Sequence, residues 1–189
     1  AGLRAAAEAS IQISYQTEDL NAALKVISNA LDDIDLSAID GSEIPYPDII
    51  SALVLAGAID EANQMVAEYE QRVPMGVRRG NFGYYFAKAD LALATHDLTS
   101  ARNAASLLET ELGCGLCTTV ILAQAAEAEG DLEGAINFYE RRLENTPPYG
   151  MEYLLLDKPT VFMRLGEIHS ELGNIDKALE AYQNFVDIW

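Results

Sequence analysis

The stretch that decides the fold runs from residue 162 to residue 186 and reads FMRLGEIHSELGNIDKALEAYQNFV. Its second half repeats apolar residues with the spacing of one helical face, at Ile175, Ala178, Leu179, Tyr182, Phe185 and Val186. Gly173 precedes that face, and glycine adopts the left-handed conformation with which helices commonly end. Asn174 comes next and can cap the following helix through its side chain. The stretch therefore predicts two amphipathic helices joined by a short break.

The same arrangement recurs in the rest of the chain. Four segments align without internal gaps, namely 43–74, 82–113, 116–147 and 159–189, and residues 1–40 supply a fifth unit. Asp60, Asp97 and Asp131 lie in the breaks of the other units and, like Asn174, can cap the helix that follows. A small residue follows each break at the same distance, at Ala62, Ala101, Ala135 and Ala178, and Ala23 holds the matching place in the first unit. Alanine lets two helices approach closely, whereas a larger side chain would force them apart. Each unit is therefore predicted to be a pair of closely packed helices.

These units predict an all-α fold, an α-α superhelix of about ten helices in which about five hairpins stack as a right-handed solenoid. No stretch of comparable length alternates with the period of a strand. We expect a single repeat domain over residues 1–189. The chain starts at Ala1 rather than Met and stops at Trp189 in mid-pattern, so we also expect it to be a fragment of a longer protein.

Composition narrows the classes of function. Thirty acidic against twelve basic residues give a formal net charge of −18, which argues against binding to nucleic acid or to anionic membranes. Half of the residues are hydrophobic, which is enough for a real core, yet no apolar run approaches the ~20 residues that span a bilayer. No signal peptide is visible either, so we expect a cytoplasmic location.

The last two units carry a recognisable set of residues. Segment 159–189 has Phe162, Leu165, Gly166, Gly173, Ala178 and Tyr182, and segment 116–147 has Leu122, Ala123, Gly130, Ala135, Tyr139 and Pro147. These residues resemble the pattern of the tetratricopeptide repeat, which spans about 34 residues. A finer likeness is to the repeat regions of multidomain bacterial signalling proteins such as serine/threonine kinases. The resemblance implies a scaffold that binds other proteins.

The resemblance also implies a binding groove, because in this family the first helices of the repeats line the concave face. The groove positions carried over to this chain are Phe86, Asp90, Leu93, Val120, Gln124, Glu127, Met163, Arg164, Glu167 and Glu171. The set is apolar and acidic, with Arg164 the one basic side chain close by. We therefore expect a polypeptide partner with apolar and basic residues, whose association rate and salt dependence reflect charge complementarity.

Cys114 and Cys117 have the spacing of a thiol redox pair or of half a zinc site. A zinc site needs about four ligands, and the two histidines, His96 and His169, fall in other repeats, so no metal site is predicted. Nothing that resembles a strand precedes the cysteines, as a thioredoxin-like redox motif would require. Ordinary thiols, able to form a disulfide under oxidation, are favoured, and a redox pair stays open as an alternative.

No catalytic constellation emerges from the sequence. A kinase phosphate loop, a nucleophile elbow and a zinc-protease motif are all missing from it. His169 occupies an inward packing position, and His96 is expected in a solvated turn. The leading hypothesis is a non-enzymatic interaction module without a cofactor. The alternatives are a small-molecule sensor, closed by residues 149–158, or a redox-responsive domain. Self-association through the C-terminal unit, with Phe185 and Trp189, is a further hypothesis.

Overall fold

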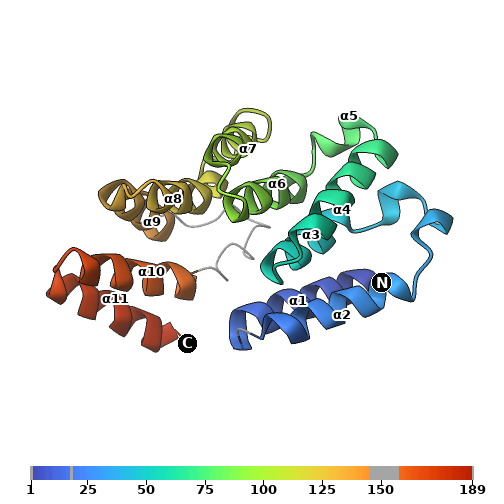
Figure 1. Ribbon diagram of the computed structural model, residues 1–189. Helices are drawn as coiled ribbons and strands as arrows, with labels where there is room; N and C mark the ends of the chain where they lie inside the picture. The colour runs from blue at the N-terminus through green and yellow to red at the C-terminus, as the bar shows by residue number, and fades with distance from the viewer. Residues whose placement is uncertain (1, 18, 145–157, 189) are drawn as a thin grey trace. The chain divides into compact units, whose positions relative to one another are not determined.

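The computed structural model describes residues 2–17, 19–144 and 158–188, and over these residues the chain forms helices and no strand (Figure 1). The helices are α1 Gly2–Thr17, α2 Leu20–Asp32, α3 Tyr46–Leu55, α4 Ile59–Arg72, α5 Met75–Arg78, α6 Phe82–Ala94, α7 Leu98–Thr110, α8 Thr119–Ala128, α9 Leu132–Glu144, α10 Lys158–Glu171 and α11 Ile175–Ile188. Three short 3-10 turns are η1 Leu36–Ala38, η2 Gly41–Glu43 and η3 Leu116–Thr118. The predicted all-α fold is confirmed.

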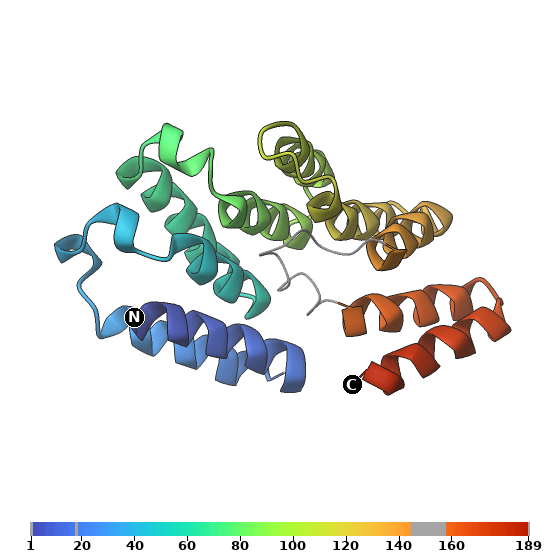
Figure 2. The ribbon, with the colours of Figure 1, turned by 180° about the vertical axis from the view of Figure 1, so that it is seen from behind.

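Ten of the described helices pair as hairpins: α1–α2, α3–α4, α6–α7, α8–α9 and α10–α11. Each hairpin falls in one of the five segments aligned from the sequence, and α10 begins one residue before its segment. The short helix α5 and the 3-10 turns lie in the connections between hairpins, where the sequence gives only breaks. The two views in Figures 1 and 2 show the members of each hairpin side by side.

The chain divides into two compact units, Ala1–Leu112 and Gly113–Trp189, which we call unit 1 and unit 2. In unit 1 the first helices of three successive hairpins lie next to one another, because α3 contacts both α1 and α6. In unit 2, α10 contacts α9 of the preceding hairpin as well as its own partner α11. One repeat domain over the whole chain, and a concave groove along it, stay predictions.

The breaks between paired helices follow the local chemistry of the sequence. Gly57, Gly130 and Gly173 have positive φ angles of 75° to 79°, and His96 takes the same conformation with φ 56°. Asp97 then caps α7 by accepting the backbone N–H of Ser100 at 3.1 Å, as predicted. The matching prediction for Asp60 is wrong. Helix α4 already begins at Ile59, so Asp60 lies inside its first turn and makes no cap.

The alanines that mark the repeats all lie in the interior. Ala23, Ala62, Ala101 and Ala135 have no exposed surface and Ala178 is 4 % exposed, so close helix packing at these positions is confirmed. The core of unit 2 joins residues from all four of its helices, at Ala123, Ala126, Ala135, Ile136, Tyr139, Val161, Leu165, Ile168 and Ala181. Tyr182 packs against Gly166 so closely that a Cβ atom there would meet its ring. These contacts fix α10 between α9 and α11.

Among the helices of residues 2–17, 19–144 and 158–188, none combines the length and the apolar character that crossing a membrane demands. The predicted roles of Pro147, of Trp189 and of residues 149–157 fall outside the described residues.

Candidate partner-binding surface

Helix α6 carries three of the groove residues expected from the sequence: Phe86, Asp90 and Leu93. All three are partly buried. The hydroxyl of Ser51 on α3 donates a hydrogen bond to the Asp90 carboxylate, with 3.0 Å between Oγ and Oδ2. Asp90 therefore lies where two neighbouring first helices meet. We call Ser51 together with these three residues of α6 the first-helix surface.

The Asp90 carboxyl is unusual among the acidic groups of the chain. Burial raises its pKa to about 6, and the hydrogen bond from Ser51 acts in the opposite direction. No basic side chain of the described residues forms an ion pair with it. Asp90 is thus a carboxylate that the fold partly removes from water without supplying a cation.

A second polar contact joins the first helices of unit 1. The Nε atom of Arg4 on α1 lies 3.4 Å from Oδ2 of Asp48 on α3. Burial raises the pKa of Asp48, and the nearby carboxylate of Glu8 raises it further, while Arg4 lowers it. Two carboxyls, those of Glu8 and Asp48, therefore lie near one arginine where α1 meets α3.

The sequence analysis missed Arg4, Glu8, Asp48 and Ser51. A signal for Ser51 was present, because it has the same place in segment 43–74 that Asp90 has in segment 82–113. No groove positions were carried over to residues 1–40 or to segment 43–74. Asp48 and Arg4 had no such signal, since only the packing of α1 against α3 brings them together.

In unit 2 the predicted residues form a cluster of their own. The Arg164 guanidinium on α10 donates hydrogen bonds to Glu127 on α8 and to Glu167 one turn further along its own helix. The Tyr139 hydroxyl donates to Oε1 of Glu127 at 2.5 Å. The hydrogen bond to Glu127 is the main cause that raises the pKa of Arg164, and burial raises that of Tyr139. Two of the acidic groove residues thus already have an internal cation.

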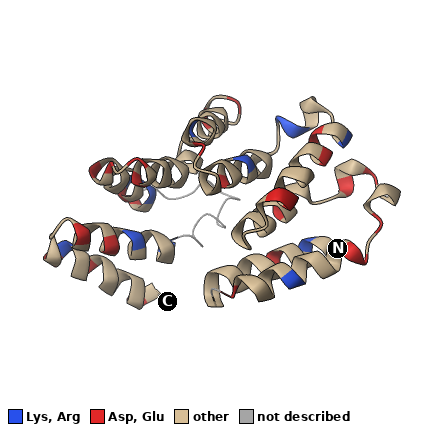
Figure 3. Ribbon diagram, viewed as in Figure 1, with Lys and Arg blue, Asp and Glu red and all other residues tan. Residues whose placement is uncertain are grey.

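The other predicted residues of unit 2 lie outside this cluster. Gln124 and Glu171 are exposed, Met163 is partly buried, and Val120 packs against the apolar core. Figure 3 shows acidic residues spread over the helices of both units, with fewer basic residues among them. The charge of the chain is therefore broadly distributed. Asp90 is therefore distinguished from the other carboxylates by its local surroundings and not by the overall charge.

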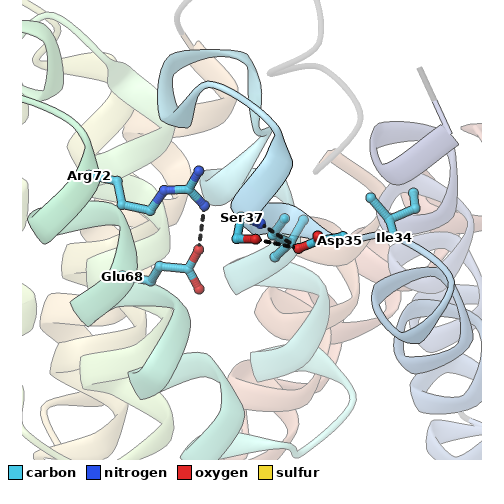
Figure 4. Close-up of a pocket in the computed structure, with 6 residues that line it drawn as sticks. Ile34, Asp35, Ser37, Glu68 and Arg72 are labelled. Carbon is cyan, nitrogen blue, oxygen red and sulfur yellow. Dashed lines mark hydrogen bonds and ion pairs between the residues drawn. The ribbon is translucent and has the colours of Figure 1, made fainter.

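A hollow of about 490 Å³ opens in unit 1 between α4 and the segment that follows α2 (Figure 4). Its lining consists of Ile34, Asp35, Leu36, Ser37, Glu68 and Arg72. Its polar groups bond to the chain itself, because Arg72 donates to Glu68 at 2.8 Å and Asp35 accepts the Ser37 hydroxyl at 2.6 Å. The hollow is built from other residues than the segment 149–158 expected to close a sensor pocket. It offers no argument for a small-molecule ligand.

Cys114 and Cys117 form a disulfide with Cα atoms 5.3 Å apart. This corrects the sequence analysis, which favoured ordinary thiols, because the turn of η3 brings the two side chains together. Both residues are buried, and the Cys117 amide donates to Sγ of Cys114 at 3.3 Å. His169 is buried on α10 and His96 is exposed, as predicted. Nowhere in the described parts of the chain do three or more potential metal ligands gather.

Comparison with known proteins gives one match. A family model described as tetratricopeptide repeat matches residues 159–188, which make up α10 and α11 apart from the first residue of α10. The comparisons with curated proteins and with solved structures found no match. The last hairpin is therefore similar to a tetratricopeptide repeat, while the other hairpins are related to it by their helical pairing and their buried alanines.

Proposed function

We propose that this chain is a non-catalytic protein interaction module that binds a polypeptide through the first-helix surface. The repeat match at the last hairpin and the helical pairing throughout the described residues both support an interaction module, since stacked repeats of this kind present extended binding surfaces. The choice of surface rests on the half-buried Asp90 carboxylate at the contact between α3 and α6. Ser51 lies beside it, and no cation from the described part of the chain does.

The surroundings of Asp90 define the chemistry of the partner. Phe86 lies one turn before it on α6 and Leu93 one turn after it, so apolar groups flank the carboxylate on the same helix face. A Lys or Arg side chain from the partner would form a charge-assisted hydrogen bond with the carboxylate. Apolar residues of the partner on either side of that cation would cover Phe86 and Leu93. We therefore propose a partner segment with a basic residue between apolar ones.

The wider setting follows from the resemblance of the repeats. We propose that the chain is a cytoplasmic regulatory region of a larger bacterial signalling protein. The likeness of the closing repeat to such regions supports this setting, and so does a net charge that disfavours binding to nucleic acid and anionic membranes. In unit 2, Gln124, Met163 and Glu171 are proposed as further contact residues of the partner. In the Glu127–Arg164–Glu167 cluster the arginine offsets part of the negative charge of the two carboxylates, so we do not propose this cluster as an acidic contact.

Selection from a displayed peptide library, followed by replacement of Asp90 with asparagine, tests this function. We expect the selected peptides to carry a Lys or Arg between apolar residues, and their affinity to fall at least about tenfold in Asp90→Asn, because a charge-assisted bond becomes a neutral one. Affinity should also fall as salt rises to about 0.5 M, where charges are screened within a few Å. Fluorescence anisotropy measures both effects.

The control is Glu109→Gln, which removes the same charge from the exposed surface of α7 in the same hairpin. Its affinity for the selected peptides should equal that of the unmodified chain. Equal losses in both variants would mean that only overall charge attracts the peptides. Unchanged binding in Asp90→Asn would remove the first-helix surface from the proposal.

The same variant has a predicted effect on stability. A carboxyl with a pKa of about 6 in the folded chain, against 3.8 normally, stabilises the fold while it is protonated, and loses that contribution as pH rises from about 4 to 6. At pH 7.5 the buried charge therefore opposes folding, and Asp90→Asn should raise the Tm there, with a smaller gain at pH 4. A lower Tm at pH 7.5 would instead assign Asp90 a structural role.

The disulfide favours a second candidate, a redox-responsive domain. A dithiol reductant would reduce the Cys114–Cys117 disulfide to two thiols and would itself be oxidised to a disulfide. Reduction should lower the free energy of unfolding by about 2 kcal/mol, the value expected for so short a loop. Chemical denaturation with and without reductant measures this, and Cys114→Ser/Cys117→Ser should not respond. A redox function also requires peptide affinity to differ between the two forms, and equal affinities would reject it.

A further inference from the structure

The last helix carries an apolar stripe that faces solvent. Ile175, Leu179 and Val186 on α11 are 57 %, 62 % and 65 % exposed, respectively. Their spacing places them on one side of the helix, over its whole length. Exposed aliphatic residues are ordinary when they are scattered, but a continuous stripe commonly marks a place where another surface packs. We call these three residues the α11 stripe.

The preceding hairpin shows what such a stripe does in this fold. Alignment of the two hairpins through their glycine breaks and buried alanines pairs Leu132, Ile136 and Leu143 of α9 with the three residues of the α11 stripe. Ile136 is buried in the core cluster of unit 2, and Leu132 and Leu143 are partly buried and pack against it. Ile136 is 9 % exposed, whereas its counterpart Leu179 is 62 % exposed. The same position of the repeat is therefore buried on α9 and exposed to solvent on α11.

Helix α10 packs over the apolar face of α9. Helix α10 packs on α9 and contributes Val161, Leu165 and Ile168, spaced by four and three residues, to the same cluster. Figures 1 and 2 both show α10 lying between α11 and the α8–α9 hairpin. Repetition of the α9–α10 interface predicts a helix with the apolar spacing of α10 upon the α11 stripe.

Charge narrows the choice of occupant. Asp176, Glu180 and Asp187 are exposed on α11, and Lys177 is its one basic residue. A second copy of this chain would bring a net charge of −18 against another −18, which opposes association. A helix with Lys or Arg beside its apolar stripe would instead find complementary charge.

We propose that the α11 stripe is a docking surface for a basic amphipathic helix with aliphatic residues at the spacing of Val161, Leu165 and Ile168. The proposal is separate from the proposed function, because it concerns the second helix of the last hairpin rather than the first-helix surface. Such a helix would cover the three stripe residues as the core cluster of unit 2, to which α10 contributes, covers their counterparts on α9.

The test uses a synthetic peptide of residues 158–171 that carries Glu167→Lys and Glu171→Lys, labelled with a fluorophore. Anisotropy titration with the full chain should give saturable binding, weakened at least about tenfold by Leu179→Gln/Val186→Gln. The matched control is Leu20→Gln/Val77→Gln, which alters two exposed aliphatic residues of unit 1 and should leave binding unchanged. A peptide with Val161, Leu165 and Ile168 replaced by serine should not bind. Circular dichroism verifies that each variant is folded.

Several results would overturn the proposal. The first is no saturable binding up to about 1 mM, and the second is equal binding to the chain and to Leu179→Gln/Val186→Gln. A third is a dimer in sedimentation velocity that this variant abolishes while the peptide fails to bind, because a second copy would then cover the stripe. Loss of peptide binding in Asp90→Asn alone would assign the peptide to the first-helix surface. If binding depends on the stripe but not on Asp90, the docking surface stands whatever becomes of the proposed function.

Discussion

Replacement of Ile168 by alanine is expected to lower the free energy of unfolding of unit 2 by about 2–5 kcal/mol. Ile168 is 2 % exposed and belongs to the core cluster that joins the helices of this unit. The truncation removes buried apolar surface and leaves a cavity that α9 and α11 can only partly fill. Chemical denaturation measures the loss, and hydrogen exchange of peptides from residues 113–188 shows whether it is confined to unit 2.

Leu179→Ala is the matched control, because it truncates an aliphatic residue of the same hairpin that is already in water. Without a bound partner helix we expect its stability to stay within about 0.5 kcal/mol of the unmodified chain. Equal destabilisation by the two variants would contradict the assignment of Ile168 to the core and of Leu179 to the surface. The pair therefore tests the burial pattern on which the α11 stripe depends.

Ala135→Leu has the second largest expected effect, a loss of about 1–3 kcal/mol in unfolding free energy. Ala135 has no exposed surface and lies in the core cluster of unit 2. A leucine there adds three carbon atoms to a packed site, so α9 must move away from its neighbours or the new side chain must adopt a strained rotamer. Denaturant titration measures the stability, and the loss should appear although leucine is a good helix former.

Asn137→Leu gives the control for this substitution. It introduces the same side chain on the same helix at an exposed position, and we expect a change within about 0.5 kcal/mol. A stable Ala135→Leu variant would show that the hairpins tolerate a wider separation than their shared alanines indicate. The result would then also weaken the use of these alanines to align one hairpin with the next.

Much of the fold could be read from the sequence because its signals are local. Gly130 and Gly173 end helices through their own backbone conformation, and Asp97 caps α7 by accepting an N–H only three residues away. The apolar spacing within each segment then selects the face that packs. These features depend on neighbours within one or two turns, which is why the hairpins fall in the aligned segments. Asp60 failed as a cap because the capping position of α4 is Ala58, two residues earlier.

The candidate site was less accessible to the sequence because its chemistry depends on register between helices. Asp90 was placed on the expected helix, yet its contact with Ser51 follows from the packing of α3 against α6. Arg164 and Glu167 are neighbours on one helix, but the pairing of Arg164 with Glu127 is explained only by the approach of α10 to α8. Charge pairs between distant segments leave no periodic trace in the chain.

The sequence by itself thus determined the helices, their pairing into hairpins and the small residues at which they pack, because each is set by spacing along a single helix. The tertiary structure alone decided which carboxylates have a cation, that the two cysteines are joined, and that Leu179 is open where Ile136 is covered. The physical reason is that burial and pairing belong to contacts between helices. Two hairpins of nearly the same pattern therefore differ in what their second helices leave exposed to a partner.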